Sequence, residues 1–175
     1  MNSGMLHFHS LIYHASNLRY QKVLAGVLAR IRASLDMLTN FQTSVTEIRS
    51  ILKADRVGIF QFYSELDWQG ELIVESVDPT VPSALEMGVT DHCFGERFAT
   101  LYQEGQINAI SDIYAQGYKS CYVELLEKFQ VRANMVAPLL KGTELWGLIC
   151  VHQCDAPRDW TPTDMVFMQQ LYRLE

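Results

Sequence analysis

The spacing of apolar residues changes near Asp55, and this change constrains the fold more than any other feature of the chain. In residues 20–31 and 38–52, apolar residues recur at intervals of three and four, which is typical of amphipathic helices. From residue 57 onward they alternate with other residues, as in a half-buried strand. We therefore expect two helices before the first strand, the second of them capped at 39–40.

The remaining pattern predicts strands and helices in turn. A hairpin is expected from strands at 57–62 and 71–77 with a polar turn at 64–67, and Pro79 and Pro82 end its second strand because proline cannot donate to a strand ladder. Further along we expect a weak helix at 96–103, a short strand at 107–113, a helix at 122–129 capped by Ser120, two strands at 135–140 and 144–151, and a last helix that starts at Thr161 and is still in pattern at Glu175. This order implies an α+β domain with a central antiparallel sheet of about five or six strands and helices packed on both sides.

Composition sets limits on size and partners. The chain has 175 residues, of which 49% are hydrophobic, enough for one substantial core but not for two comfortable domains; we expect an extension over residues 1–18 and one domain over 19–175. The net charge of −6 argues against a nucleic-acid partner, which needs a clustered basic face. His7, His9 and Ser10 interrupt any apolar run at the start, so we expect no secretory signal, no membrane span and a cytoplasmic location.

Four short motifs follow one another in the second half of the chain. They are Asp91-His92-Cys93-Phe94, Ser120-Cys121-Tyr122, the stretch Phe129–Asn134, and Val151-His152-Gln153-Cys154. Together they resemble the light-sensing GAF domains of the cyanobacteriochrome family, in the dual-cysteine Asp-x-Cys-Phe subgroup of the phytochrome superfamily. The resemblance spans roughly residues 20–174, and it implies a GAF fold that covalently binds a linear tetrapyrrole (a bilin), either phycocyanobilin or phycoviolobilin.

Cys121 is the candidate for permanent attachment of the pigment. It lies in the first turn of the predicted helix, where the positive end of the helix dipole lowers the pKa of a thiol and favours the nucleophilic thiolate. The resemblance implies a thioether to ring A. Relatives usually have a histidine at the next position, where Tyr122 stands here, and Tyr122 either packs under the bilin or fills the core. A lone cysteine is more often a small buried hydrophobe, and the surrounding motif is what favours attachment.

Cys93 is the candidate second thiol. The resemblance implies that it adds reversibly to the central methine bridge of the bilin, which shortens the conjugation and gives a blue-absorbing dark state with a green-absorbing photoproduct. Asp91, two residues upstream, offers a carboxylate to the pyrrole N–H groups, and Phe94 completes the motif. The alternatives are an ordinary loop cysteine beside Phe94 and a turn-forming aspartate.

His152 belongs to a predicted strand whose even positions, Trp146 to Cys154, share one apolar face. A histidine there needs a polar partner. The resemblance implies a ring-D carbonyl or a propionate of the bilin, and a satisfied core histidine is the alternative. The same face offers Cys150, His152 and Cys154 as metal ligands, but a spacing of two along a strand is unfavourable for zinc.

The propionates of a bilin need cations or phenols. Relatives often have an arginine in the segment that reads Ala99–Gln103 here, but this segment contains none. Tyr102 is the candidate donor. Arg97, Lys119 and Arg132 are alternative cations, each of which otherwise reads as a surface charge.

The leading hypothesis is a photosensory module, not an enzyme, that responds to light by Z/E isomerisation next to ring D and biases an attached output domain. Its partners would be the bilin and an output domain further along the chain. The amphipathic first and last helices allow a homodimer, although packing within one chain explains the same stripes. Two alternatives are a GAF-fold free methionine sulfoxide reductase working through a sulfenic acid and a disulfide, and a cyclic-nucleotide-binding GAF module with incidental cysteines.

Overall fold

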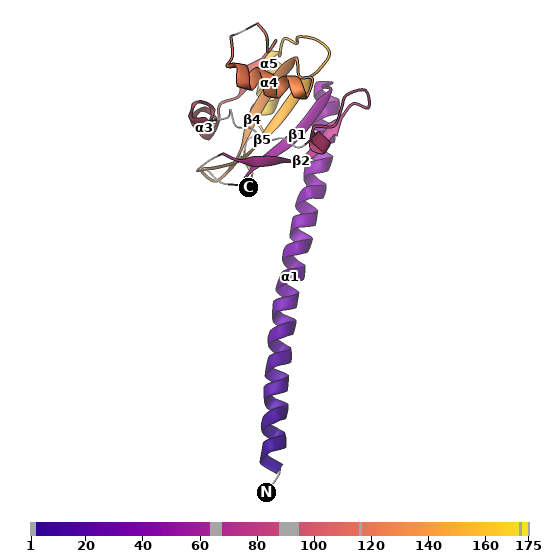
Figure 1. Ribbon diagram of the computed structural model, residues 1–175, viewed down its shortest axis with the longest axis vertical. Coiled ribbons are helices and arrows are strands. Elements are labelled where there is room, and N and C mark those ends of the chain that lie inside the picture. The colour runs from indigo at the N-terminus through magenta and orange to yellow at the C-terminus, as the bar shows by residue number, and fades with distance from the viewer. Residues whose placement is uncertain (1–2, 64–67, 88–94, 116, 172, 175) are drawn as a thin grey trace. The chain divides into compact units, whose positions relative to one another are not determined.

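The computed structural model describes residues 3–63, 68–87, 95–115, 117–171 and 173–174 (Figure 1). The chain divides into two compact units, Met1–Asn40 and Phe41–Glu175. The first unit is helical over its described part, and the second contains a sheet with several helices. No helix within the described ranges is long and apolar enough to cross a lipid bilayer.

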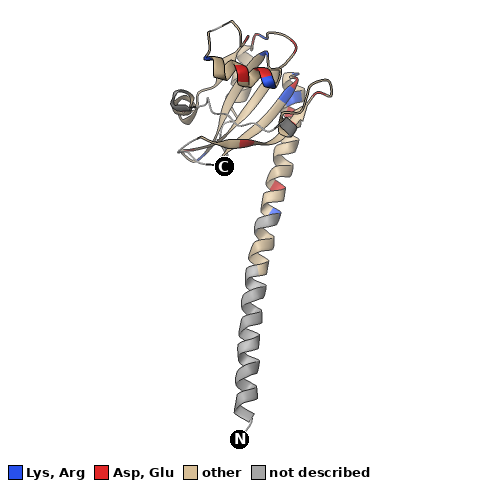
Figure 2. Ribbon diagram, viewed as in Figure 1, with Lys and Arg blue, Asp and Glu red and all other residues tan. Residues whose placement is uncertain are grey.

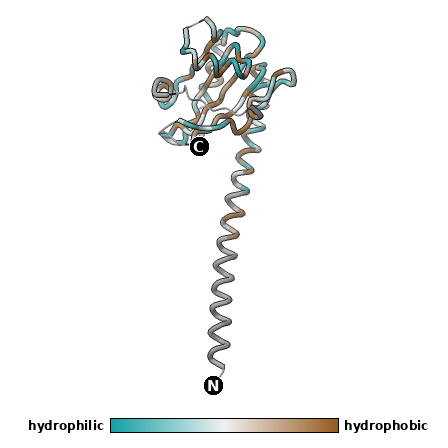
Figure 3. Tube along the Cα trace, viewed as in Figure 1, coloured by the Kyte–Doolittle hydropathy of each residue, from teal (hydrophilic) through white to brown (hydrophobic). Residues whose placement is uncertain are grey.

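Helix α1 runs without interruption from Ser3 to Leu52, so the prediction of two separate helices is wrong. Thr39, expected at a helix start, donates its hydroxyl hydrogen to the carbonyl oxygen of Leu35 at 2.9 Å. A threonine that bonds back four residues in this way lies inside a helix and does not cap one. Apolar residues recur along the described part of α1 (Figure 3), and Leu24 and Leu35 are exposed.

Within the described residues, six strands form one sheet in the order β2-β1-β5-β4-β3, with β6 beside β4. They are β1 (Arg56–Phe62), β2 (Gly70–Val77), β3 (Asn108–Ile110), β4 (Ala133–Lys141), β5 (Glu144–Gln153) and β6 (Arg173–Leu174). Each pairing is antiparallel except that of β4 with β6, which is parallel. The α+β class, the antiparallel sheet and the first hairpin are therefore confirmed. Strand β3 is shorter than predicted.

Helices α2 (Ala84–Met87), α3 (Gly95–Gln103), α4 (Ser120–Lys128) and α5 (Pro162–Gln169) accompany the sheet. Two predicted helix ends need correction. The N-cap of α4 is Lys119, which makes no side-chain cap bond, and Ser120 is the first helical residue. Helix α5 ends at Gln169 and the chain continues into β6, because Gln170 and Leu171 donate their N–H groups to carbonyls three residues back and tighten the last turn.

The predicted start of α5 is confirmed. The Thr161 hydroxyl oxygen accepts a hydrogen bond from the Asp164 backbone N–H at 3.1 Å, and the Asp164 carboxylate accepts one from the Thr161 N–H at 3.0 Å. This reciprocal capping box satisfies two amides that have no partner inside the helix. It is the local signal that the sequence carried at this position.

A β-bulge at Trp146 reverses the alternation of side chains along β5, so that Leu145, and not Trp146, shares a face with Leu148. The pairing with β4 advances by one residue on β4 and by two on β5, from Gly147 to Leu145, so Trp146 is an extra residue. Its ring centre lies 5.5 Å from that of Phe41 on α1, whereas Leu145 belongs to a core cluster with residues of β1 and α3. The prediction that Trp146 shares a face with His152 is therefore wrong.

Two apolar clusters pack α3 and α4 against the sheet. One joins β1, β4 and β5 to α3 through residues such as Phe60, Tyr102 and Leu148. The other joins β3 to α4 through Ile110 and Leu126. The charged residues of α4 (Figure 2) are Glu124, Glu127 and Lys128, and all three are exposed. Helix α4 thus has one face against the core and one in water, as its apolar period predicts.

Candidate ligand-binding cavity

A cavity lies between one face of the sheet and helices α3 and α4. It contains about 780 Å³ of empty space when its opening to solvent is included. Sixteen of the described residues line it: Arg56, Gly58, Phe60, Leu72, Ala84, Phe98, Tyr102, Tyr122, Leu125, Leu126, Phe129, Asn134, Val136, Leu148, Cys150 and His152. Most of these are apolar or aromatic, with a few polar groups among them, which is the usual composition of a small-molecule site.

Aromatic rings form one wall of the cavity. The ring centre of Phe98 on α3 lies 5.5 Å from that of Tyr122 on α4 and 6.4 Å from that of Tyr102, and both pairs are stacked. Tyr118 adds a third contact, at 5.9 Å from Tyr122. Neighbouring rings of this kind offer flat apolar surface with phenol groups at the edge. The wall therefore suits a flat conjugated ligand, and Tyr102 and Tyr122, both predicted site residues, belong to it.

Cys121 occupies the first turn of α4, as the sequence predicts. Its residue is exposed, and it directly precedes the cavity-lining Tyr122. Cys121 forms a disulfide in the structure, and once reduced its sulfur lies where the positive end of the α4 dipole favours a thiolate. The helix thus brings a potential nucleophile to the rim of the aromatic wall.

Three polar side chains form a row across three neighbouring strands. Arg56 on β1 is the cross-strand partner of His152 on β5, and His152 is the partner of Asn134 on β4. All three line the cavity, and Arg56 and Asn134 are each only 1% exposed. Of the three, only His152 was predicted as a site residue. The row exists because of strand register, which brings together positions far apart in the sequence.

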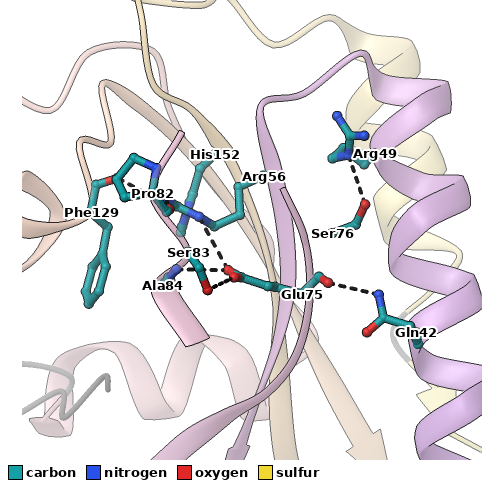
Figure 4. Close-up of polar contacts among 10 residues, drawn as sticks. All are labelled: Gln42, Arg49, Arg56, Glu75, Ser76, Pro82, Ser83, Ala84, Phe129 and His152. Atoms are coloured by element: carbon teal, nitrogen blue, oxygen red, sulfur yellow. Dashed lines mark hydrogen bonds and ion pairs between the residues drawn. The ribbon is translucent and has the colours of Figure 1, made fainter. Parts of the chain in front are cut away.

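Arg56 is held by three protein groups (Figure 4). Its Nη1 donates to the carbonyl oxygen of Phe129 at 3.1 Å and its Nη2 to that of Pro82 at 2.6 Å. Its Nε lies 3.6 Å from the Glu75 carboxylate. Because these groups already neutralise and bind the guanidinium, Arg56 is a structural cation of the cavity wall and not a candidate for a ligand's carboxylate.

Glu75 completes the charge compensation and connects the cavity wall to α1. Its side chain is 5% exposed, and its carboxylate accepts hydrogen bonds from the Ser83 hydroxyl and from the Ala84 backbone N–H at the start of α2. Its backbone carbonyl accepts one from the Gln42 amide of α1 at 2.9 Å (Figure 4). A buried carboxyl group is unfavourable unless such donors pair with it.

The Arg56 contact determines the protonation of His152. The Arg56 Nη1 lies 3.3 Å from the His152 Nδ1, and since a guanidinium can only donate, Nδ1 must accept. The imidazole hydrogen therefore lies on Nε2. Burial first, and the positive charge of Arg56 second, lower the pKa of His152 from 6.5 to about 3. His152 is thus a neutral imidazole whose Nε2–H is the donor that it offers to a ligand.

This shifted pKa predicts an acid-dependent stability that a His152→Gln variant lacks. Below pH 6.5 the unfolded chain binds a proton at residue 152 that the folded protein does not bind until about pH 3. Between pH 6.5 and about pH 3, His152 therefore lowers the free energy of unfolding of the wild type by about 1.4 kcal/mol for each pH unit of acidification. Above pH 6.5 His152 makes the free energy of unfolding no more dependent on pH. Urea unfolding of both proteins at pH 7.5 and 4.5 measures the difference, expected at roughly 2–3 kcal/mol; parallel pH profiles would contradict the neutral assignment.

Two of the three alternative cations, Arg132 and Lys119, do not line the cavity. Arg132 pairs with Asp112 through two hydrogen bonds, at 2.7 and 2.9 Å, and it is not a lining residue. This pairing holds the pKa of the Asp112 carboxyl below its usual value. Lys119 is exposed at the N-cap of α4. The side chain of Arg97 lies outside the described residues.

One of the three candidate metal ligands, Cys154, lies beyond the end of strand β5. Strand β5 ends at Gln153, so Cys154 does not continue the alternation of Cys150 and His152. Its backbone N–H bonds to the Asp55 carboxylate at 2.6 Å, and burial raises the pKa of its thiol to about 11. Within the described part of the chain, no three His, Cys, Asp or Glu side chains are grouped to hold a metal ion.

Three predicted site residues lie outside the described residues: Asp91, Cys93 and Phe94. Among the apolar and polar lining residues that were not predicted as site residues, two are charged or amide side chains, Arg56 and Asn134. Arg56 had a weak signal, since it is a charge at the start of an otherwise apolar strand, and Asn134 had one as the last residue of a motif. Neither signal indicates a cavity without the register of the sheet.

The chain is similar to known proteins over most of its length. The GAF domain family model matches residues 36–174. A Synechocystis protein that carries the name of a methyl-accepting chemotaxis protein is 37% identical over 150 residues, and the match covers 86% of this chain and 15% of that protein. The chain thus spans a small part of this relative.

Solved structures of photoreceptor domains share the fold. The GAF domain of the cyanobacteriochrome PixJ from Thermosynechococcus elongatus, in its blue-light-absorbing form, is 32% identical with a TM-score of 0.72, and the match covers 79% of this chain and 81% of that one. The far-red-absorbing dark state of JSC1_58120g3, with bound biliverdin IXα, is 26% identical with a TM-score of 0.67, over 75% of this chain and 82% of that one.

Proposed function

This chain belongs to the GAF domain family, and from that premise we propose that it is a photosensory module that covalently binds a linear tetrapyrrole, phycocyanobilin or phycoviolobilin. The observation that carries the proposal is the stacked wall of Phe98, Tyr102 and Tyr122 beside the thiol-bearing first turn of α4. The likeness to photoreceptor GAF domains, one of which has bound biliverdin, supports it.

The chemistry of the cavity fits a bilin. Such a pigment is a long conjugated chain of four rings that needs apolar walls, and Phe60, Leu72 and Leu148 provide them together with the aromatic stack. Its carbonyl groups need donors, and His152 offers a neutral N–H. We assign Tyr102 as a phenol donor to a propionate, because it is 3% exposed and lines the cavity.

Attachment is assigned to Cys121. The thiolate of Cys121 adds to the unsaturated side group of ring A: a carbon–sulfur bond forms and the proton of the thiol ends on the pigment, with no oxidant and no leaving group. The bound pigment then supplies light absorption and Z/E isomerisation next to ring D. Tyr122 and Phe98 exclude water from one face, and His152 holds an acceptor group in place.

A second, reversible bond is assigned to Cys93, with Asp91 as the carboxylate for pyrrole N–H groups and Phe94 as a neighbouring wall. These three residues lie outside the described residues, and their roles come from the Asp-x-Cys-Phe motif alone. With that bond intact the pigment absorbs blue light, and with it broken green light.

The module has no substrate to turn over in this proposal, and its output is a conformational change. Because a relative that carries the name of a chemotaxis protein is matched over 15% of its length, we propose that residues 19–175 act as the sensory domain of a longer cytoplasmic protein, with residues 1–18 as an extension. A homodimer is part of the proposal as a route for the signal.

The test is to express the chain, with reductant present, in cells that make phycocyanobilin. We expect a coloured protein whose absorption changes reversibly under blue and green light, and whose colour stays with the polypeptide on a denaturing gel. A colourless product would contradict the proposal. Colourless protein with thiol-dependent reduction of methionine sulfoxide would favour the reductase alternative. Tight binding of a cyclic nucleotide would favour a cyclic-nucleotide-binding GAF module.

A further inference from the structure

Helix α4 begins without a side-chain cap. Its N-cap residue, Lys119, makes no side-chain bond to the first turn, and that turn contains no acidic residue to interact with the helix dipole. The N–H groups of Tyr122 and Val123 share one acceptor, the Lys119 carbonyl oxygen, at 3.0 and 3.2 Å. Helix ends fray, and a missing cap removes one restraint. The position of Cys121 in this turn therefore depends on contacts from outside the α4 backbone.

Tyr122 provides such contacts. Its ring stacks on that of Phe98 from α3, with centres 5.5 Å apart, and is tilted against that of Tyr118 at 5.9 Å. Its hydroxyl oxygen accepts a hydrogen bond from the Asn134 Nδ2 on β4 at 2.9 Å. Stacked rings tolerate sliding, whereas a hydrogen bond is directional. The bond to Asn134 is thus the contact that fixes Tyr122 at one point.

Asn134 is a rigid anchor for this bond. Strand β4 pairs on both sides at this residue, with Ile110 on β3 and with His152 on β5, and Asn134 is 1% exposed. Its Oδ1 is buried with no hydrogen-bond partner in the described part of the chain. An apolar side chain of similar size would avoid this unsatisfied acceptor. The amide therefore has its clearest use in the bond to Tyr122.

We propose that Asn134 is a positioning residue for attachment of the pigment: through Tyr122 it holds the first turn of α4, so that the reduced sulfur of Cys121 meets the side group of ring A. This inference rests on the proposed function and names what aligns its reacting thiol. The addition between two groups held side by side depends steeply on their alignment, and a displacement of about 1 Å can slow such a reaction roughly 100-fold.

The experiment breaks the bond from either side. Tyr122→Phe keeps the ring and removes the hydroxyl group, and Asn134→Leu removes the amide without a large change in volume. Reduced, pigment-free protein is mixed with increasing concentrations of phycocyanobilin, and the pigment that stays on the polypeptide after acid denaturation is measured over time. The rate at saturating pigment reports alignment, and the concentration that gives half of this rate reports binding.

We expect the saturating attachment rate to fall roughly tenfold in each variant, with a smaller change in the half-saturating concentration. The double variant should be no slower than either single variant, because both changes break the same bond. Asn134→Asp keeps an oxygen that accepts the Tyr122 hydroxyl hydrogen, so it is expected to attach the pigment at nearly the wild-type rate. This rescue preserves the test if Asn134→Leu folds poorly.

Tyr114→Phe is the matched control. The Tyr114 hydroxyl group also bonds to α4, but at Glu127 near the other end of the helix, and Tyr114 does not line the cavity. We expect the wild-type attachment rate in this variant. A second control is the reaction of reduced Cys121 with iodoacetamide, a small reagent that needs no alignment. This reaction should be equally fast in wild type and Tyr122→Phe, which separates alignment from a change in thiol acidity.

Four results would overturn the inference and leave the proposed function standing. They are losses that multiply in the double variant, slow attachment in only one of the two single variants, slow attachment in Asn134→Asp or in Tyr114→Phe, and a matching loss of the iodoacetamide reaction. Reduced wild type that attaches no pigment would overturn the proposed function itself.

Discussion

A Cys121→Ala variant is expected to lose all pigment attachment that survives denaturation. Cys121 lies in the first turn of α4, directly before the cavity-lining Tyr122, and alanine removes the sulfur that the attachment needs. The pigment can still enter the cavity but leaves it on denaturation. Zinc-induced fluorescence of the polypeptide on a denaturing gel measures the attachment.

Cys154→Ala is the matched control for this loss. Like Cys121, Cys154 belongs to the second unit, but it is a free thiol that does not line the cavity, and burial raises the pKa of this thiol to about 11. We expect full attachment in this variant. Attachment that survives Cys121→Ala, or disappears in Cys154→Ala, would show that another thiol holds the pigment.

An Arg56→Met variant is expected to lose about 3–5 kcal/mol of the free energy of unfolding. Methionine fills much of the volume of arginine, but it leaves the Glu75 carboxylate, 5% exposed, without its counter-ion. The carbonyl oxygens of Phe129 and Pro82 also lose their donor. Urea unfolding of the pigment-free protein measures this difference, which is a large fraction of the stability of a typical domain.

Two comparisons separate the buried pair from an ordinary ion pair. Arg132→Met breaks an ion pair in which the Arg132 side chain is 37% exposed and the Asp112 side chain 19%. It should lower the free energy of unfolding by about 1 kcal/mol or less. The double variant Arg56→Met, Glu75→Gln removes both charges and should recover part of the loss. If Arg56→Met is no more destabilising than Arg132→Met, the buried charge of Glu75 does not depend on Arg56 for its compensation.

The elements that the sequence predicted well are those with local signals. The α5 start follows from the Thr161–Asp164 capping box, and the hairpin of β1 and β2 from alternation ended by prolines. The errors arise where tertiary contacts decide. Nothing in residues 31–38 interrupts α1, and the threonine near its predicted break bonds back into the helix.

The face of the sheet on which a side chain lies could be predicted only with knowledge of the strand register. Trp146 leaves its expected face because a bulge against β4 inserts an extra residue in β5, next to Gly147, where an added Cβ would overlap the carbonyl oxygen of Phe60. Arg56 and Asn134 reach the cavity only because their strands flank β5. Pairings between strands so far apart along the chain have no signature in a single sequence.

The most direct test of the central claim is the mass of one tryptic peptide from protein made in the presence of phycocyanobilin. Cleavage after Lys119 and Lys128 releases Ser120–Lys128, which contains Cys121 and no other cysteine. We expect this peptide to carry the full mass of one bilin and to absorb visible light. An unmodified Ser120–Lys128 peptide, with the pigment on another peptide or on none, would contradict it.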